Sequence, residues 1–231
     1  MAAEPVVAVV QARMGSTRFP GKTLAPFAGT TVLRHLLDRL RAVAHPLDLC
    51  VATTDLREDD AVVAECEAAG VAVYRGAADD VLARFAGCIR SLAETPSLVL
   101  RVCADRPLLC PVLADELLDA YDELGRPDYL ANNLPPSYPA GLDLELVRVD
   151  CLEQAARESE DAYEREHVTP FVYRRPERFR LAGLVCPFGN FSHVKLALDT
   201  RDDYERLTGI HQRLPAGYDY RDILTAVELA A

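Results

Sequence analysis

Three cations set among glycines are the first feature of this sequence with the residue types for chemistry. In the stretch QARMGSTRFPGK, Arg13, Arg18 and Lys22 lie within ten residues of one another, in a chain with a formal net charge of -11. Glycines let backbone N–H groups approach a polyphosphate, and arginine and lysine supply positive charge. A strand-to-loop turn with ordinary surface cations is the alternative. Because the cations cluster in an otherwise acidic chain, the stretch predicts a phosphate-binding loop.

This loop does not follow the Walker A pattern, in which four residues separate the first glycine from Gly-Lys-Ser/Thr. Five residues separate Gly15 from Gly21 here. Pro26 and Gly29 also prevent a regular helix from starting at the lysine, because proline lacks an N–H and glycine disfavours helix. The sequence therefore predicts backbone amides and cations in a loop of another kind.

Two aspartates follow predicted strands. Asp105 comes after the apolar run 98–102, and Asp199 directly follows the run 194–198. Ligands of parallel sheets bind beyond the carboxyl ends of the strands, so we expect both carboxylates beside the loop. Mg²⁺ usually binds through one or two carboxylates plus substrate phosphates, which predicts that the pair shares one Mg²⁺ site. For each aspartate alone, a helix N-cap is the alternative, since a helix start follows closely.

Short apolar runs alternate with segments of helical period along most of the chain. This alternation predicts an α/β fold, with a Rossmann-like, mostly parallel sheet that has helices on both faces. The predicted strands are 6–10, 47–52, 71–74, 98–102 and 194–198. The predicted helices are 32–43, 59–69, 80–93, 111–124, 202–214 and a closing helix after Tyr220.

The alternation breaks after about residue 126, in a stretch rich in proline and asparagine. Beyond it, residues 142–149 alternate like a strand, 152–158 suit a helix, and 179–185 suit a further strand. We expect a single domain, 1–231, in which residues 128–187 are an insertion over one edge of the ligand cleft.

Composition excludes several classes of function. An acidic chain is a poor partner for nucleic acid, because counterion-releasing contacts need clustered cations. No signal peptide is expected at the N-terminus, and no apolar stretch approaches the length of a membrane span. The seven cysteines are odd in number and lack a Cys-x-x-Cys pair. They predict buried reduced thiols in a cytoplasmic protein rather than zinc sites or disulfides.

Several short motifs are spread along nearly the whole chain. Two of them are specific: QARMGSTRFPGK at 11–22 and EREHVTP at 164–170. The weaker ones are VATTD at 51–55, YRG at 74–76, DVLAR at 80–84, RVCADRP at 101–107, PAGLDLE at 139–145 and LDT at 198–200. In this order, the motifs resemble those of the cytidylyltransferases that activate acidic sugars, most closely the spore coat polysaccharide biosynthesis protein F type. The resemblance implies a nucleotide-diphospho-sugar transferase fold, often as a homodimer.

The resemblance implies transfer of CMP from CTP to a small acidic acceptor, with release of pyrophosphate and a need for Mg²⁺. Its implied catalytic residues are Arg13, Lys22, Asp105 and Asp199, and the last two would bind the metal. Its implied nucleotide-binding residues are Ala12, Arg13, Met14, Gly15, Ser16, Arg18, Lys22, Thr53, Arg84 and Asp105. Segment 128–187 would cover the acceptor side and contribute a dimer contact, with Asp143, Glu145, Glu166 and His167 as implied acceptor-binding residues.

Some positions depart from the family's pattern or have more than one interpretation. Phe19, Arg106 and Lys195 replace the family's usual residues, and Arg106 alters the charge next to Asp105. His167 suits an acceptor-binding cluster, a helix cap or a dimer contact; a zinc ligand would need partners at ligand spacing. The other histidines are expected to be surface or core residues without a metal role.

Two other classes of function stay open on the sequence alone. A glycosyltransferase that uses a finished nucleotide-sugar can share the fold, and a catalytically silent nucleotide-binding regulator can keep the loop. The identity of the acceptor is not readable from one chain.

Overall fold

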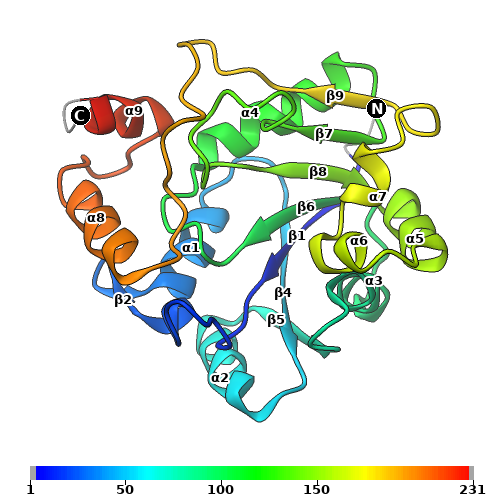
Figure 1. Cartoon of the computed structure of the whole chain (residues 1–231), viewed down its shortest axis with the longest axis horizontal. Helices are drawn as coiled ribbons and strands as arrows, with labels where there is room; N and C mark the ends of the chain where they lie inside the picture. Colours follow the sequence, from blue (N-terminus) through cyan, green and yellow to red (C-terminus); the bar gives the residue numbers. More distant parts are fainter. Residues whose placement is uncertain (1–3, 229–231) are drawn as a thin grey trace.

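The computed structural model describes residues 4–228, and its centre is one seven-stranded sheet (Figure 1). The strands are β1 (Val6–Gln11), β4 (Asp48–Thr54), β5 (Ala72–Gly76), β6 (Leu98–Cys103), β7 (Tyr129–Ala131), β8 (Glu145–Arg148) and β9 (Leu181–Gly183). Their order in the sheet is β5-β4-β1-β6-β8-β7-β9. Only β8 runs antiparallel to its neighbours, β6 and β7. The predicted mostly parallel α/β sheet is therefore confirmed.

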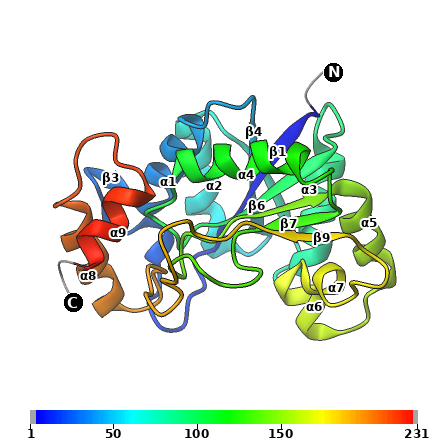
Figure 2. The same ribbon diagram turned by 90° about the horizontal axis from the view of Figure 1, so that it is seen from above.

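Helices cover both faces of the sheet (Figure 2). They are α1 (Val32–Arg41), α2 (Asp60–Ala69), α3 (Val81–Ser91), α4 (Pro111–Glu123), α5 (Val149–Glu158), α6 (Ala162–His167), α7 (Pro170–Tyr173), α8 (Arg201–His211) and α9 (Tyr220–Glu228). Two short 3₁₀ helices, η1 (Lys22–Leu24) and η2 (Arg57–Asp59), and a small hairpin of β2 (Pro26–Phe27) and β3 (Thr30–Thr31) complete the elements.

The central strands are largely apolar because each of their faces meets a separate core. Along β1, Ala8 and Val10 join the core that contains α1, α2 and α4, while Val7 and Val9 join the core that contains α3 and α5. Successive side chains of a strand point to opposite faces, so a strand buried on both faces needs a continuous apolar run. The sheet is consequently a rigid base for residues at its carboxyl edge.

The predicted strand at 194–198 is wrong. The segment is extended, but its backbone forms only an isolated bridge between Lys195 and Ala140, and the Leu198 N–H donates to the Asp105 carbonyl at 2.8 Å. Leu196 and Leu198 are fully buried, so the apolar pattern records burial in the core rather than membership of the sheet.

Segment 128–187 contributes three strands to the sheet. Strand β7 lies in the proline-rich stretch and was not predicted, while β8 and β9 fall inside the predicted strands 142–149 and 179–185. The short helices α6 and α7 were also not predicted. They lie with α5 against the face that α3 covers, and this arrangement brings α6 close to the start of α3.

Three negative findings bear on function. No helix within residues 4–228 combines the length and apolar character that a membrane crossing needs. The same residues hold no group of three or more His, Cys, Asp or Glu side chains that could bind a metal ion. All seven cysteines are free, and six are buried as expected; Cys103 is partly exposed, at the end of β6.

Candidate active site

The glycine-containing loop after β1 is folded around the backbone of Met14. The Met14 carbonyl accepts hydrogen bonds from the N–H groups of Ser16, at 2.8 Å, and Gly21, at 3.2 Å. Gly21 has a φ of 73°, a left-handed conformation that favours glycine. Within residues 4–228, the N–H groups of Gly15 and Thr17 donate to no protein acceptor. The loop is thus a fixed turn with free backbone donors, as an anion site requires.

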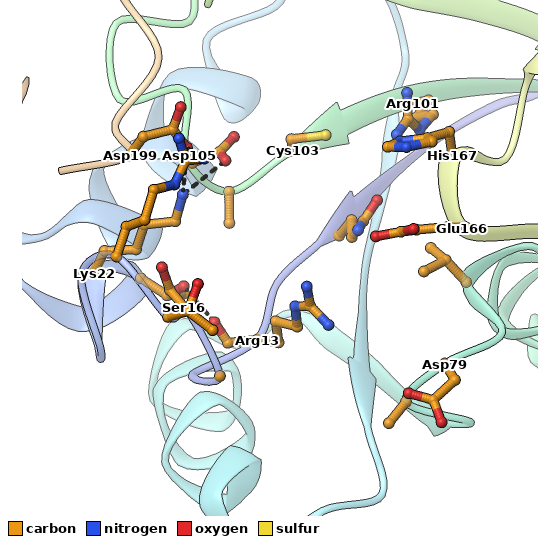
Figure 3. Close-up of a pocket in the computed structure, with 18 of the residues that line it drawn as sticks. Arg13, Ser16, Lys22, Asp79, Arg101, Cys103, Asp105, Glu166, His167 and Asp199 are labelled. Atoms are coloured by element: carbon orange, nitrogen blue, oxygen red, sulfur yellow. Dashed lines mark hydrogen bonds and ion pairs between the residues drawn. The ribbon is translucent and has the colours of Figure 1, made fainter. Parts of the chain in front are cut away.

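Lys22 joins this loop to both predicted metal-binding aspartates (Figure 3). Its Nζ lies 2.9 Å from Asp105 Oδ2, 3.3 Å from Asp199 Oδ1 and 2.6 Å from the Leu198 carbonyl oxygen. The lysine side chain is only 13% exposed. One ammonium therefore holds together three segments that are far apart in sequence.

Three cations surround Asp199. Besides Lys22, Arg18 lies at 3.0 Å and Lys195 at 3.1 Å from its carboxylate oxygens. Burial, the largest single influence, raises the pKa of Asp199, but the hydrogen bond from Lys195 and the charge of Lys22 outweigh it and hold the pKa below its usual value. The carboxylate is therefore ionised at neutral pH and already paired with cationic side chains.

Neither aspartate caps a helix, which was the alternative interpretation. Thr200 is the N-cap of α8 and forms a capping box with Asp203, while Cys110 precedes the first residue of α4. Asp105 and Asp199 thus have no capping role that accounts for their positions.

A cavity of about 600 Å³ extends from these carboxylates across the carboxyl edge of the sheet. Figure 3 shows Lys22, Asp105 and Asp199 at one end, with Arg101 and His167 at the other. Other residues of the wall include Arg13, Gly15, Ser16, Arg18, Asp79, Cys103 and Glu166. The cavity therefore has one end lined by the cations of the loop and the two aspartates, and a second end built from β6 and α6.

This combination of a mostly parallel sheet, a cation-bearing loop and two carboxylates that share Lys22 is typical of a known family. The family model described as cytidylyltransferase matches residues 7–216. The chain belongs to the cytidylyltransferase family. It is accordingly an enzyme of the nucleotidyltransferase class, as the sequence predicted.

Two curated relatives show the range of this family. The chain is 33% identical over 216 residues to spore coat polysaccharide biosynthesis protein SpsF of Bacillus subtilis (strain 168), covering 90% of this chain and 87% of that protein. It is 30% identical over 224 residues to 3-deoxy-manno-octulosonate cytidylyltransferase of Anaeromyxobacter dehalogenans (strain 2CP-C), covering 96% of this chain and 85% of that one. The resemblance stated from the motifs is confirmed.

A solved structure agrees with the fold of this cytidylyltransferase. The structure of a cytidylyltransferase from Leptospira borgpetersenii serovar Hardjo-bovis (strain JB197) superposes with a TM-score of 0.90 and 30% identity. The match covers 98% of this chain and 95% of the other. The nucleotide-diphospho-sugar transferase fold is confirmed with it.

The EREH motif of the enzyme divides into a structural half and a cavity-facing half. Glu164 is buried and accepts hydrogen bonds from the Ser159 hydroxyl and from Arg175, each at 2.6 Å. Arg165 pairs with Asp80, the N-cap of α3, and so attaches α6 to α3.

The second half of the motif faces the cavity. Glu166 and His167 both line it. The centroid of the His167 ring lies 4.3 Å from that of Tyr163, with the two ring planes tilted by 52°. Val168, a β-branched residue, follows with a strained φ of 74°. His167 is the last residue of α6 rather than its cap, and it lines the cavity.

Glu145 and Asp143 do not line the cavity. Glu145, in β8, is buried and forms an ion pair with Arg101, the residue opposite it on the neighbouring strand β6. It also accepts hydrogen bonds from the hydroxyls of Tyr129 and Thr169, each at 2.6 Å. Burial, the largest single influence, raises the pKa of Glu145. The charge of Arg101 and the two hydroxyl hydrogen bonds together outweigh burial and hold the pKa below its usual value.

Asp143 instead pairs with Arg106 at 3.3 Å. The unusual charge of Arg106 is thus balanced within the protein, so it does not leave an unpaired cation beside Asp105.

Four of the implied nucleotide-binding residues do not line the cavity: Ala12, Met14, Thr53 and Arg84. Arg84 is 1% exposed, and its Nη1 donates to the carbonyls of Ala77, at 2.5 Å, and Ala78, at 3.3 Å. Because Ala78 lines the cavity, Arg84 shapes the wall through this loop.

Sequence reasoning did not single out several residues that line the cavity, among them Asp79, Arg101 and Cys103, and it also missed Asp59 behind the loop. Arg101 lines the cavity from the middle of β6, where its polar side chain interrupts an apolar strand. Asp59 binds the loop backbone from η2, and its only signal in sequence was its place after the VATTD motif. An arginine inside a buried strand is a signal that sequence reasoning could have used.

Proposed function

We propose that this enzyme transfers CMP from CTP to a small acidic, sugar-type acceptor and releases pyrophosphate. The observation that carries the proposal is the convergence of Lys22 on Asp105 and Asp199 beside a loop with free backbone donors. This arrangement can neutralise a triphosphate and place its α-phosphorus at the mouth of the acceptor end.

Asp105 and Asp199 fit a Mg²⁺ ion. Both are carboxylates, both already attract the same cationic nitrogen, and within residues 4–228 no third His, Cys, Asp or Glu side chain joins them. Mg²⁺ commonly binds through one or two carboxylates and completes its shell with water and substrate phosphates. When bound, the ion would supply charge that stabilises the phosphates.

In the proposed reaction, an acceptor oxygen attacks the α-phosphorus of CTP, the bond from the α-phosphorus to the bridging oxygen breaks, and pyrophosphate leaves. Arg13, Arg18 and Lys22 would stabilise the negative charge that builds on the phosphate oxygens. The N–H groups of Gly15 and Thr17 would orient the triphosphate.

We infer that the acceptor lies at the end of the cavity formed by Glu166 and His167. Asp143 and Glu145 would act there indirectly, through Arg106 and Arg101. The positively charged loop favours placing an acidic group of the acceptor toward Arg13, while Glu166 suits its hydroxyl groups.

The proposal is tested by pyrophosphate release from CTP with Mg²⁺ and a panel of sugar acids that includes 3-deoxy-manno-octulosonate, with mass spectrometry of the product. UTP, ATP and GTP are the controls for the base, and a chelator is the control for the metal. Release of a free nucleotide from a nucleotide-sugar would indicate a glycosyltransferase instead. Binding of CTP without pyrophosphate release for any acceptor would favour a silent nucleotide-binding protein. The predicted homodimer is tested separately, by light scattering of the purified chain.

A further inference from the structure

A buried carboxylate lies directly beneath the phosphate-type loop. Asp59, the last residue of η2, has no exposed surface. Its Oδ1 accepts the Met14 N–H at 2.6 Å, and its Oδ2 accepts both the N–H of Thr54, at 3.2 Å, and the Thr54 hydroxyl. No basic side chain within residues 4–228 forms an ion pair with it. The carboxylate is therefore held by hydrogen bonds without an ion pair, and these hydrogen bonds join the loop to the end of β4.

The contact to Met14 acts on the part of the loop that determines its shape. The Met14 carbonyl already holds the N–H groups of Ser16 and Gly21, so Asp59 fixes the other side of the same residue. The loop also packs closely on η2, because a Cβ on Gly15 would come within 2.7 Å of Glu58 Oε1. The free donors of the loop thus keep their direction through a contact outside the cavity.

We propose that Asp59 is a positioning residue that holds the loop in the conformation that binds the triphosphate of CTP. This inference rests on the proposed function, because it assumes that the loop binds a triphosphate. The charge of Asp59 by itself would weaken CTP binding, because a negative charge beneath the loop repels phosphates. If Asp59 mainly positions the loop, removing its charge should weaken CTP binding. If its repulsion of phosphates dominates, removing the charge should strengthen CTP binding.

Asp59→Asn separates the two effects. An asparagine can accept from Met14, but it then turns its own NH₂ toward the Thr54 N–H, so at least one buried donor loses its acceptor. If position dominates, CTP binds more weakly; if charge dominates, CTP binds more tightly.

The experiment measures CTP affinity by titration calorimetry with Mg²⁺ for the wild type, Asp59→Asn, Thr54→Val and the control Asp60→Asn. Asp60 is exposed, adjacent in sequence and paired with Arg75, so its substitution makes the same change of charge away from the loop. Thermal unfolding without nucleotide sets a temperature at which every variant is folded. We expect Asp59→Asn to weaken CTP binding at least about tenfold, Thr54→Val to weaken it by less, and Asp60→Asn to change it less than about twofold.

Each other outcome overturns the inference. Equal or tighter CTP binding by folded Asp59→Asn would show that the carboxylate has only a structural role, even if the variant melts at a lower temperature. If Asp59→Asn does not fold, unchanged affinity in Thr54→Val would have the same meaning. A wild type that binds no CTP would refute the proposed function, an outcome that the variants cannot produce.

Discussion

Replacing Lys22 by methionine removes the cation that joins Asp105 and Asp199 but keeps an unbranched apolar side chain in its place. In the structure, Lys22 Nζ lies 2.9 Å from one carboxylate and 3.3 Å from the other. An opposite charge at about 4 Å contributes about 4 kcal/mol at an effective dielectric constant near 20, and the partial exposure of both carboxylates reduces this figure. Loss of one pre-organised donor to a transition state costs about 2.7–4 kcal/mol, so we expect kcat to fall about 10²–10³-fold.

The same substitution should increase the affinity of the site for a divalent cation. The ammonium of Lys22 occupies the space between the two carboxylates, so in the absence of nucleotide it competes with a divalent cation. Lys22→Met should therefore bind Mn²⁺ more tightly than the wild type when no CTP is present, measured by titration calorimetry. The variant would thus lose turnover while it gains affinity for the metal.

Lys195→Met is the matched control. Lys195 contacts Asp199 at 3.1 Å, but it is 45% exposed and does not line the cavity. We expect it to lower kcat by less than about tenfold, because an exposed ion pair contributes little. Near-wild-type turnover in Lys22→Met, or equal losses in the two variants, would refute the reasoning that places Lys22 at the reacting phosphate.

Three further predictions concern the metal, the core and pH. Asp105→Asn and Asp199→Asn should each lower activity by orders of magnitude, and the double variant should be scarcely worse than the worse single one, because the pair acts as a unit; additive losses would count against a shared site. Glu145→Gln should destabilise the fold by about 3–5 kcal/mol in urea unfolding, because it leaves Arg101 buried without its counter-charge; an unchanged midpoint would contradict this. Burial, His211 and Arg39 lower the pKa of His35 from 6.5 to about 4, so the unfolded chain binds its proton more readily. The contribution of neutral His35 to folding stability is therefore complete above pH 6.5 and is lost as the pH falls toward about 4. Over that range, the melting temperature of His35→Leu should fall less than that of the wild type.

Local chemistry made the loop and most of the sheet predictable. The alternation of apolar runs and amphipathic segments depends on neighbouring residues, and β1, β4, β5, β6 and the helices that follow them fall within or close to their predicted ranges. The clustering of Arg13, Arg18 and Lys22 is equally local, so the sequence alone determined which part of the chain forms the cation-bearing end of the cavity.

Long-range hydrogen bonds decided what the sequence could not. An extended apolar segment such as 194–198 has the same pattern inside and outside a sheet, because the pattern records burial and not the partner of each backbone group. Glu145 belongs to the PAGLDLE motif, for which the resemblance implied an acceptor-binding role, yet its position opposite Arg101 in β6 encloses it in the core.

Asp59 is the clearest case of a role that only tertiary structure assigned. Nothing near it in sequence shows that its carboxylate accepts the N–H of Met14, which lies 45 residues earlier in the chain. The sequence thus determined the fold class, the loop and the two aspartates through residue type and period. Which side chains face the cavity, and which hold its walls from behind, depended on contacts between distant segments that exist only once the sheet is assembled.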